Sequence, residues 1–386
     1  MIRTGFASKN VRWISHSLIA LTLSLSAGTL VSAEETQLGA ATVVWDKDVA
    51  LASDSIYEHG SNEILAASVQ SDQVNISSVN SSGIKKSKLS FNKHSLGYLA
   101  SFHQTNGGGY ISVGGASVLK VNAQGGKDWE YSIPKSNTYL MSVDQLNNGN
   151  YITVGTTPGL NGDKDQILTK FSGNGTVIWQ KTWNKPTEDS VSRVMHTADG
   201  GFVVVGESSE AGTNNTNIVI SKYTNTSKLE WEKTLVPSQD SQNLWTTGII
   251  QDSDGYVLTG YYNHPNPDGG VRYLTTGFVL KTDMAGNLIW SKPLASQWDR
   301  SQVNDIALDS DGGYLITGKV NEDWHGTTSK EYVAHLDSAG TTQWETIVNR
   351  TNSINRGAAV QPIQGGVLAI GSADQTVKAT KLTTGQ

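Results

Sequence analysis

The 386-residue sequence contains no cysteine. It can therefore form no disulfide bond and no zinc–thiolate site, and it offers no cysteine for a lipid anchor. It also lacks a Gly-x-Ser-x-Gly nucleophile elbow, a His-Glu-x-x-His zinc motif and a Walker phosphate loop. Stability must come from packing and strand pairing, and any catalytic group has to be assembled from segments far apart in the chain.

Long apolar runs are scarce and confined to the amino terminus. Residues 1–33 have a basic start, an apolar stretch at 18–30 and the small-residue ending Val31-Ser32-Ala33. This pattern predicts a secretory signal peptide cleaved after Ala33, and no later segment is apolar enough to span a membrane. We expect a soluble protein that is secreted, either extracellular or periplasmic, and a monomer.

Positive charge is also scarce. Without the three basic residues of the expected signal peptide, 26 lysines and arginines face 35 aspartates and glutamates, a net charge of −9. Nucleic acid is therefore not an expected partner.

Glycine is abundant, with 40 residues, and much of it lies in one repeated motif. The motif is clearest at Asp311–Gly318: a Gly-rich turn, an aromatic residue, a short apolar run and a closing glycine. A degenerate first copy spans Gly60–Ala67, and the other closing glycines are residues 114, 155, 206, 260 and 371. Their spacing of 41 to 58 residues is typical of one four-stranded propeller blade.

Each repeat predicts four strands: one before the glycine turn, the motif strand, a third strand, and a fourth that carries tryptophan. The last repeat ends after its third strand, Val377–Leu382, whereas Thr42–Lys47 resembles the fourth strand Thr176–Lys181. We therefore predict an all-β fold, a seven-bladed β-propeller in which an N-terminal strand completes the C-terminal blade. Residues 34–386 are expected to form this single domain.

Six tryptophans occupy the same repeat position, which predicts packing between blades and not a ligand-binding array. They are Trp45, Trp129, Trp179, Trp231, Trp290 and Trp344.

The connections between the second and third strands differ in length. Those at 156–165, 207–217, 261–276 and 319–330 are long, and those at 115–117 and 372–376 are short. In an up-and-down blade these connections share one face, which we call the long-loop face, and such loops on a rigid frame are typical of binding sites.

Aromatic and charged residues outside the repeat pattern gather in these connections. Aromatic rings stack on sugars, while carboxylates and guanidinium groups bind hydroxyl or acid groups. An alternative is that the aromatic side chains only anchor their own loops. The predicted ligand-binding residues are Trp245, Tyr262, His264, Arg272, Tyr273, Trp298, Asp299, Arg300, Asp323, Trp324 and His325.

No metal or cofactor is predicted. The segments Asp252-Ser253-Asp254-Gly255 and Asp309-Ser310-Asp311-Gly312 resemble the start of a calcium loop. They lack its downstream glutamate and fall at the hairpin turn, where Asp is a common turn former. His335 replaces a lysine found at positions 170, 222 and 281 and is interpreted as a variant of the repeat.

The motif Asp-Gly-Gly-Tyr, an apolar run and Gly, followed by Gly-x-x-x-Trp, resembles the secreted bacterial β-propeller repeat proteins grouped as quinoprotein-like. The resemblance covers the mature chain and implies a propeller fold. True quinoprotein dehydrogenases imply eight blades, a calcium–quinone site and often a disulfide. Since this chain has about seven repeats and no cysteine, that cofactor is not carried over.

Three functions remain open at this point. The first is binding of an extracellular ligand, foremost a carbohydrate, through the long-loop face. The second is a carbohydrate-active enzyme on the same face, for example a polysaccharide lyase. In the lyase, Tyr262, His264, Tyr273 or His325 would remove a proton, and Arg272 or Arg300 would neutralise a uronate. The third is a scaffold for protein–protein interaction in the envelope.

Overall fold

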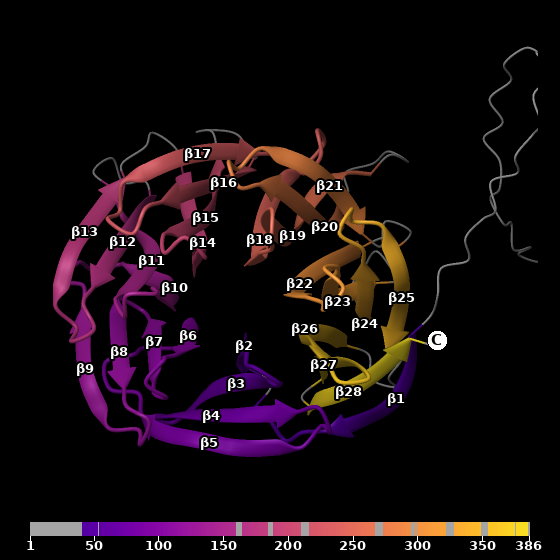
Figure 1. Ribbon diagram of the computed structural model, residues 1–386, viewed down its shortest axis with the longest axis horizontal. Helices are drawn as coiled ribbons and strands as arrows, with labels where there is room; N and C mark the ends of the chain where they lie inside the picture. Colours follow the sequence, from indigo (N-terminus) through magenta and orange to yellow (C-terminus); the bar gives the residue numbers. More distant parts are fainter. Residues whose placement is uncertain are drawn as a thin grey trace, which may run out of the picture. The chain divides into compact units, whose positions relative to one another are not determined.

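The repeat described above folds into β-sheets arranged as a ring in the computed structural model (Figure 1). The structure describes residues 41–52, 54–159, 164–183, 188–209, 216–266, 273–294, 298, 300–321, 328–348, 354–374 and 376–384. These residues all belong to one compact unit, Leu38–Gln386. Within them every regular element is a strand, and no helix suited to crossing a membrane occurs.

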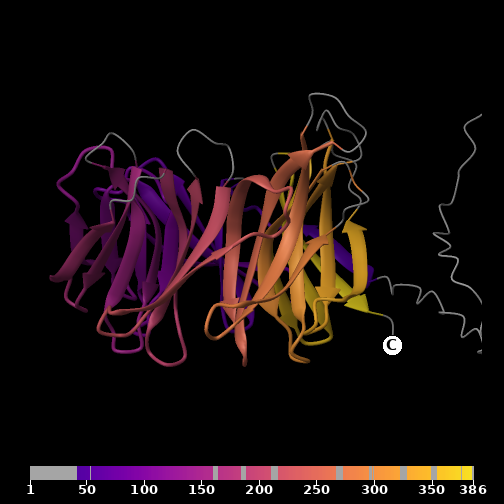
Figure 2. The ribbon, with the colours of Figure 1, turned by 90° about the horizontal axis from the view of Figure 1, so that it is seen from above.

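Five separate sheets have four strands each; in four of them the strands follow chain order from the centre of the ring outwards, and in the fifth β1 lies outside β28. The Gly-rich turns join the innermost strand to the second strand because their glycines supply the positive φ that such a turn needs, as at Gly149 (φ 79°) and Gly200 (φ 85°). Figure 2 shows the strands from the side, running between two opposite faces of this ring.

The strands of the first four sheets are β2 (Ile56–His59), β3 (Glu63–Gln70), β4 (Gln73–Asn80) and β5 (Lys85–Asn92); β6 (Ser101–Gln104), β7 (Tyr110–Gly114), β8 (Ser117–Val121) and β9 (Lys127–Ser132); β10 (Tyr139–Gln145), β11 (Tyr151–Pro158), β12 (Lys164–Phe171) and β13 (Val177–Trp183); and β14 (Glu188–His196), β15 (Phe202–Ser209), β16 (Thr216–Tyr223) and β17 (Leu229–Leu235). The fifth contains β26 (Asn355–Ile363), β27 (Gly366–Ala373), β28 (Thr376–Thr384) and β1 (Ala41–Asp48).

The prediction of seven four-stranded blades is wrong: the structure has five four-stranded blades, and eight further strands form one continuous sheet. The cause is a parallel pairing of Thr275 with Arg300, which links two neighbouring antiparallel groups. Counting repeats cannot reveal such a link, because it depends on how closely neighbouring strands approach. The eight strands are β18 (Gln242–Gln251), β19 (Gly255–Pro265), β20 (Tyr273–Asp283), β21 (Leu288–Leu294), β22 (Arg300–Leu308), β23 (Tyr314–Asn321), β24 (Lys330–Leu336) and β25 (Thr342–Val348).

The predicted closure of the ring by the N-terminal strand is confirmed. Strand β1 pairs antiparallel with β28, from Ala41 opposite Thr384 to Asp48 opposite Lys378. Apolar side chains of β3 and β4 also form one core cluster with those of β26–β28. The first and last parts of the described chain are thus joined by strand pairing and by apolar packing.

The repeated tryptophans pack between sheets, as predicted. Trp129 stacks on Phe171 of the next sheet, with ring centroids 5.6 Å apart. Three tryptophans cover a turn glycine of the next sheet and Trp290 covers one within the eight-stranded sheet, and an added Cβ at each glycine would lie 2.5–2.9 Å from the indole. These pairs are Trp45 with Gly83, Trp129 with Gly175, Trp231 with Gly286 and Trp290 with Gly340.

The closing glycine of the motif is explained by a bulge in the innermost strand. Opposite Gly155, Gly206, Gly260, Gly318 and Gly371, the register of that strand shifts by one residue. The bulge brings a backbone carbonyl so close that a Cβ on Gly206 would lie 2.1 Å from the carbonyl oxygen of Ser190. Only glycine fits there, and the bulge turns an extra side chain towards the centre of the ring.

Deleting residues 34–48 removes β1 and exposes the edge of β28. We expect the melting temperature to fall by about 10 °C or more, measured by circular dichroism. Deleting residues 34–38 alone, which leaves β1 intact, is the control. An unchanged melting temperature in the longer deletion would contradict closure by β1.

Gly206→Ala should lower the free energy of unfolding by about 1–3 kcal/mol, because the new methyl group meets the Ser190 carbonyl. Gly107→Ala is the matched control, since nothing lies within 4 Å of a Cβ at that position. Urea denaturation measures both values. Equal stabilities of the two variants would show that the bulge does not require glycine.

Candidate functional site

The centre of the ring holds a cavity of about 550 Å³. It is lined by residues of all seven innermost strands, β2, β6, β10, β14, β18, β22 and β26. Because these strands come from every part of the chain, the cavity collects side chains that no local motif connects. A cavity that gathers polar and charged side chains from so many strands is a natural candidate for a binding site.

A repeated position of the chain includes Arg356, which lines one end of the cavity, and we call this position the mouth ring. Its members are the residues whose carbonyl oxygen approaches a closing glycine, where a Cβ would lie 1.5–2.9 Å away. They are Tyr98, Tyr139, Ser190, Trp245, Gln302 and Arg356. Arg356 and its strand partner Ser372 line the cavity, so this level of the ring borders it.

Three members of the mouth ring are exposed aromatic residues. Tyr98, Tyr139 and Trp245 have exposed fractions of 43%, 47% and 43%. Trp245 stacks on Tyr261 of the adjacent strand, with ring centroids 5.1 Å apart and an interplanar angle of 26°. These three occupy equivalent positions of their repeats, and exposed aromatic faces are suited to stacking on a flat-faced ligand.

Positive charge gathers at the same end. Burial lowers the pKa of Lys319, and the nearby charges of Arg356 and Arg300 lower it further. Lys319 pairs with Gln302 of the mouth ring. Asp54 and Glu331 add negative charge here, since both act together with Arg356 on Tyr57, whose pKa burial raises to about 12. Neither Arg300 nor Arg356 makes an ion pair with a described residue.

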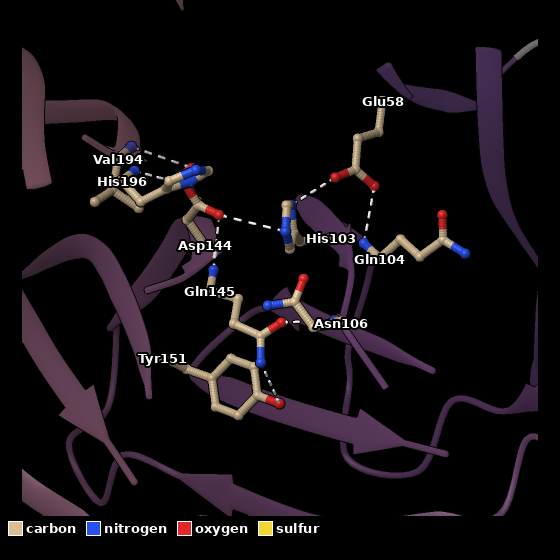
Figure 3. Close-up of polar contacts among 10 residues, drawn as sticks. Glu58, His103, Gln104, Asn106, Asp144, Gln145, Tyr151, Val194 and His196 are labelled. Carbon is tan, nitrogen blue, oxygen red and sulfur yellow. Dashed lines mark hydrogen bonds and ion pairs between the residues drawn. The ribbon is translucent and has the colours of Figure 1, made fainter. Parts of the chain in front are cut away.

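At the other end of the innermost strands, four side chains form a network across four sheets (Figure 3). Glu58 Oε1 lies 2.5 Å from His103 Nδ1, and His103 Nε2 lies 3.5 Å from Asp144 Oδ1. Asp144 Oδ2 in turn lies 2.9 Å from His196 Nδ1. Carboxylates and imidazoles thus alternate from β2 through β6 and β10 to β14.

These carboxylates also have a structural role, because the innermost strands are sheet edges with free backbone N–H groups. The Gln104 N–H donates to Glu58 Oε2 at 3.0 Å, and the His196 N–H donates to Asp144 Oδ2 at 2.7 Å. Asp305 Oδ2 accepts the Val360 N–H and also lies 2.8 Å from His59 Nε2. Each carboxylate therefore holds a neighbouring strand and an imidazole at once.

The network changes the protonation of its members. Burial opposes the charged form of His103, but its hydrogen bond to Glu58 and the charge of Asp144 raise its pKa to about 9. The hydrogen bond to Asp144 raises the pKa of His196. Burial would raise the pKa of Asp144, yet the two imidazoles lower it. At neutral pH His103 is therefore an imidazolium between two carboxylates.

Guanidinium groups complete the cavity. Arg193 lines it and is exposed, and its Nη1 donates to the neighbouring Ser192 carbonyl at 3.1 Å. Arg356 is exposed at the mouth. The carboxylates are less accessible: the side chains of Glu58, Asp144 and Asp305 are 17%, 8% and 22% exposed. A bound molecule would therefore meet mainly cationic groups.

The structure places the residues predicted from sequence in different settings. Trp245 belongs to the mouth ring. Tyr262 is buried, with 6% exposure, and packs in the apolar core on Phe278. Both ring nitrogens of His264 are engaged, Nδ1 at 3.1 Å from the Pro265 carbonyl and Nε2 at 2.9 Å from Thr276 Oγ1. Neither residue is arranged to remove a proton from a ligand.

Tyr273 is 49% exposed at the start of β20. Trp298 packs partly buried against the apolar core of the eight-stranded sheet. Arg300 begins β22 and pairs with Thr275, which is opposite Asn263, between Tyr262 and His264. The five other predicted residues lie outside the described residues: Arg272, Asp299, Asp323, Trp324 and His325.

Sequence reasoning missed most of the cavity residues, although a positional signal exists. Tyr98 and Tyr139 each stand 16 residues before their closing glycine, and Trp245 and Arg356 stand 15 before theirs. His59, His103 and Asp144 pair with the second motif-strand residue of their repeats, Ile64, Ile111 and Ile152. Aligning the innermost strands on the motif would have revealed both sets of residues, the mouth ring and the residues opposite the second motif-strand position.

Comparisons with known proteins support the fold only. No family model and no curated protein matches the chain. Among solved structures, BBS1N in complex with ARL6DN is similar with a TM-score of 0.51 at 8% identity, covering 89% of this chain and 97% of that one.

Two bacterial structures are similar as well. A protein of unknown function from Bacteroides caccae has a TM-score of 0.46 at 11% identity, covering 74% of this chain and 93% of its own. A member of the DUF4221 family from Bacteroides vulgatus has a TM-score of 0.47 at 8% identity, covering 90% and 99%. A quinoprotein-like relationship is not shown by these comparisons.

The raised pKa of His103 makes stability depend on pH. Its contribution is complete below its ordinary pKa of 6.5 and is lost as the pH rises through about 9. His103→Asn should therefore lower the free energy of unfolding by about 3 kcal/mol at pH 6 and by much less above pH 9.5. Urea denaturation across this range measures the difference.

His94→Asn is the control, because His94 lies outside the cavity in a left-handed conformation (φ 49°) that Asn tolerates. A cost of His103→Asn that is the same at both pH values would show that the network does not hold His103 protonated.

Proposed function

We propose that this β-propeller is an exported protein that binds a carbohydrate carrying an acidic group, at the mouth ring and in the cavity beneath it. The observation that carries the proposal is the repeated aromatic position of the mouth ring, where Tyr98, Tyr139 and Trp245 are all exposed. Large aromatic side chains left in water around an opening cost free energy unless a ligand covers them.

A carbohydrate suits this surface better than an apolar ligand does. The aromatic faces provide stacking for sugar rings, and the cavity offers hydrogen-bonding groups at several depths, including Ser372, Asn304 and Thr247. A sugar presents apolar ring faces and polar hydroxyl groups. The aromatic rings of the mouth ring suit the ring faces, and the polar groups of the cavity suit the hydroxyls.

An acidic group on the carbohydrate is favoured by the charges. Burial lowers the pKa of Lys319, and the charges of the nearby Arg356 and Arg300 lower it further. An anionic ligand would relieve the repulsion between these like charges, and a guanidinium can hold a carboxylate or sulfate through two parallel hydrogen bonds.

The Asp144–His196 pair favours a second candidate, a carbohydrate-active enzyme. Asp144 orients His196 through Nδ1, and the His196 side chain is 44% exposed. An imidazole held this way by a carboxylate is a common general acid or base. This pair lies at the far end of the innermost strands from the mouth ring, so the binding proposal does not depend on it.

A glycan array containing neutral, carboxylated and sulfated polysaccharides tests the proposal with the purified mature protein. Binding should be selective for acidic glycans. Trp245→Ala should weaken it by at least about tenfold, since stacking of one aromatic ring contributes on the order of 1–3 kcal/mol. Arg356→Gln should reduce the preference for acidic over neutral glycans.

Ile178→Ala is the matched control, because Ile178 is 49% exposed on the outer strand β13, away from the cavity. Binding that survives Trp245→Ala and Arg356→Gln would place the ligand elsewhere. A folded protein that retains no glycan would favour a protein partner instead. Degradation of a retained glycan, lost in His196→Asn, would establish the enzyme.

A further inference from the structure

A second cluster of chemistry-bearing side chains lies away from the cavity, at the turn between β22 and β23. Asp309 and Asp311 of this turn face His335 of β24, and one donor atom from each residue lies within 4.8 Å of the others. His335 Nε2 is 3.5 Å from Asp309 Oδ2 and 3.4 Å from Asp311 Oδ2. This cluster is independent of the proposed carbohydrate site.

The decisive observation is that His335 Nε2 is buried and has no hydrogen-bond partner among the described residues, although it points at two carboxylates. The His335 side chain is only 10% exposed. A hydrogen bond from nitrogen to oxygen spans about 2.7–3.2 Å, so neither separation is a good one. Leaving a buried nitrogen without a partner is costly unless something occupies the space between the donors.

The two separations from His335 Nε2 match those around a metal ion. Two ligand atoms on a tetrahedral zinc ion, each bonded at about 2.0–2.1 Å, lie roughly 3.4 Å apart. The other oxygens are already engaged in the turn: Asp311 Oδ1 accepts the Gly313 N–H at 2.8 Å, and Asp309 Oδ1 accepts the Ser310 N–H at 2.7 Å. This leaves the two Oδ2 atoms facing His335.

The surroundings hold His335 in place. Its ring stacks on Trp344, with centroids 6.0 Å apart and an interplanar angle of 24°. A Cβ at residue 313 would lie 2.7 Å from Nε2, so the space in front of this nitrogen exists only because residue 313 is glycine. Asp311 is 59% exposed, which leaves solvent access for a water ligand.

An equivalent turn in the same sheet, which we call the sister turn, has lysine in place of the histidine that faces the two aspartates. The turn Asp252-Ser253-Asp254 has the same residue types, but the facing residue is Lys281. The Lys281 ammonium lies 3.0 Å from Asp252 Oδ2 and 2.6 Å from Asp254 Oδ1, and so neutralises both carboxylates. His335 and Lys281 pair with equivalent motif-strand residues, Leu315 and Val257. Replacing lysine by histidine removes the built-in cation and supplies a metal ligand.

We propose that Asp309, Asp311 and His335 bind a divalent transition-metal ion, with zinc as the best fit, and that the ion fastens the β22–β23 turn to β24. Two carboxylates and one imidazole form a ligand set suited to zinc, and water would complete the coordination. The earlier interpretation of His335 as a mere variant of the repeat, with no metal predicted, is replaced by this one.

Zinc titration of the chelator-treated full mature protein by calorimetry tests the proposal. One equivalent should bind to this site at pH 7.5, zinc should raise the melting temperature, and binding should weaken at pH 5.5 as the imidazole protonates. Asp311→Asn should reduce the affinity for this equivalent by about tenfold or more. Asp254→Asn, in the sister turn, should leave it unchanged.

His335→Lys recreates the ion pair of the sister turn, so it should remain folded and lose this one equivalent of zinc. Circular dichroism and the melting temperature without zinc verify its folding. Equal zinc stoichiometry and affinity in the wild type and in folded His335→Lys would overturn the proposal, as would a wild-type protein that binds no zinc.

Discussion

The close approach of a closing glycine to the innermost strand, which occurs in six repeats, is the constraint on which the rest of the structure depends. A side chain at the closing position would collide with a backbone carbonyl, 2.1 Å away in the case of Gly206. The bulge that creates this contact bends the innermost strand and directs residues such as Thr247 and Asn304 into the cavity. The same contact determines which residue of each of these strands belongs to the mouth ring. A motif that reads in sequence as a turn and a strand therefore also positions the site.

Much of the fold could be predicted because its determinants are local and repeated. Turn glycines, alternating apolar residues and one tryptophan per repeat define the strand order, and the unmatched Thr42–Lys47 predicts closure correctly. The division into sheets could not be predicted. It depends on one parallel pairing, Thr275 with Arg300, that joins eight strands, and no residue pattern encodes the separation of two neighbouring strands.

The candidate site was less predictable for a related reason. Trp245 was predicted because it falls outside the repeat, and in the structure it is 43% exposed. Tyr262 and His264 look equivalent in sequence, but the strand places one in the core and bonds both nitrogens of the other. Glu58, His103 and Asp144 come from three different repeats, and only the closed ring brings them together. The local sequence therefore shows the chemistry of a side chain, whereas the closed ring determines which other side chains it contacts.

The central claim is that an acidic carbohydrate covers the mouth ring. Hydroxyl-radical footprinting with mass spectrometry, with and without a soluble uronic-acid oligosaccharide, tests it most directly because aromatic side chains report their own exposure. The account predicts protection of Tyr98, Tyr139 and Trp245, with no change at Ile178 on the outer strand. Protection confined to Tyr273, or no protection in the mouth ring at saturating ligand, would contradict it.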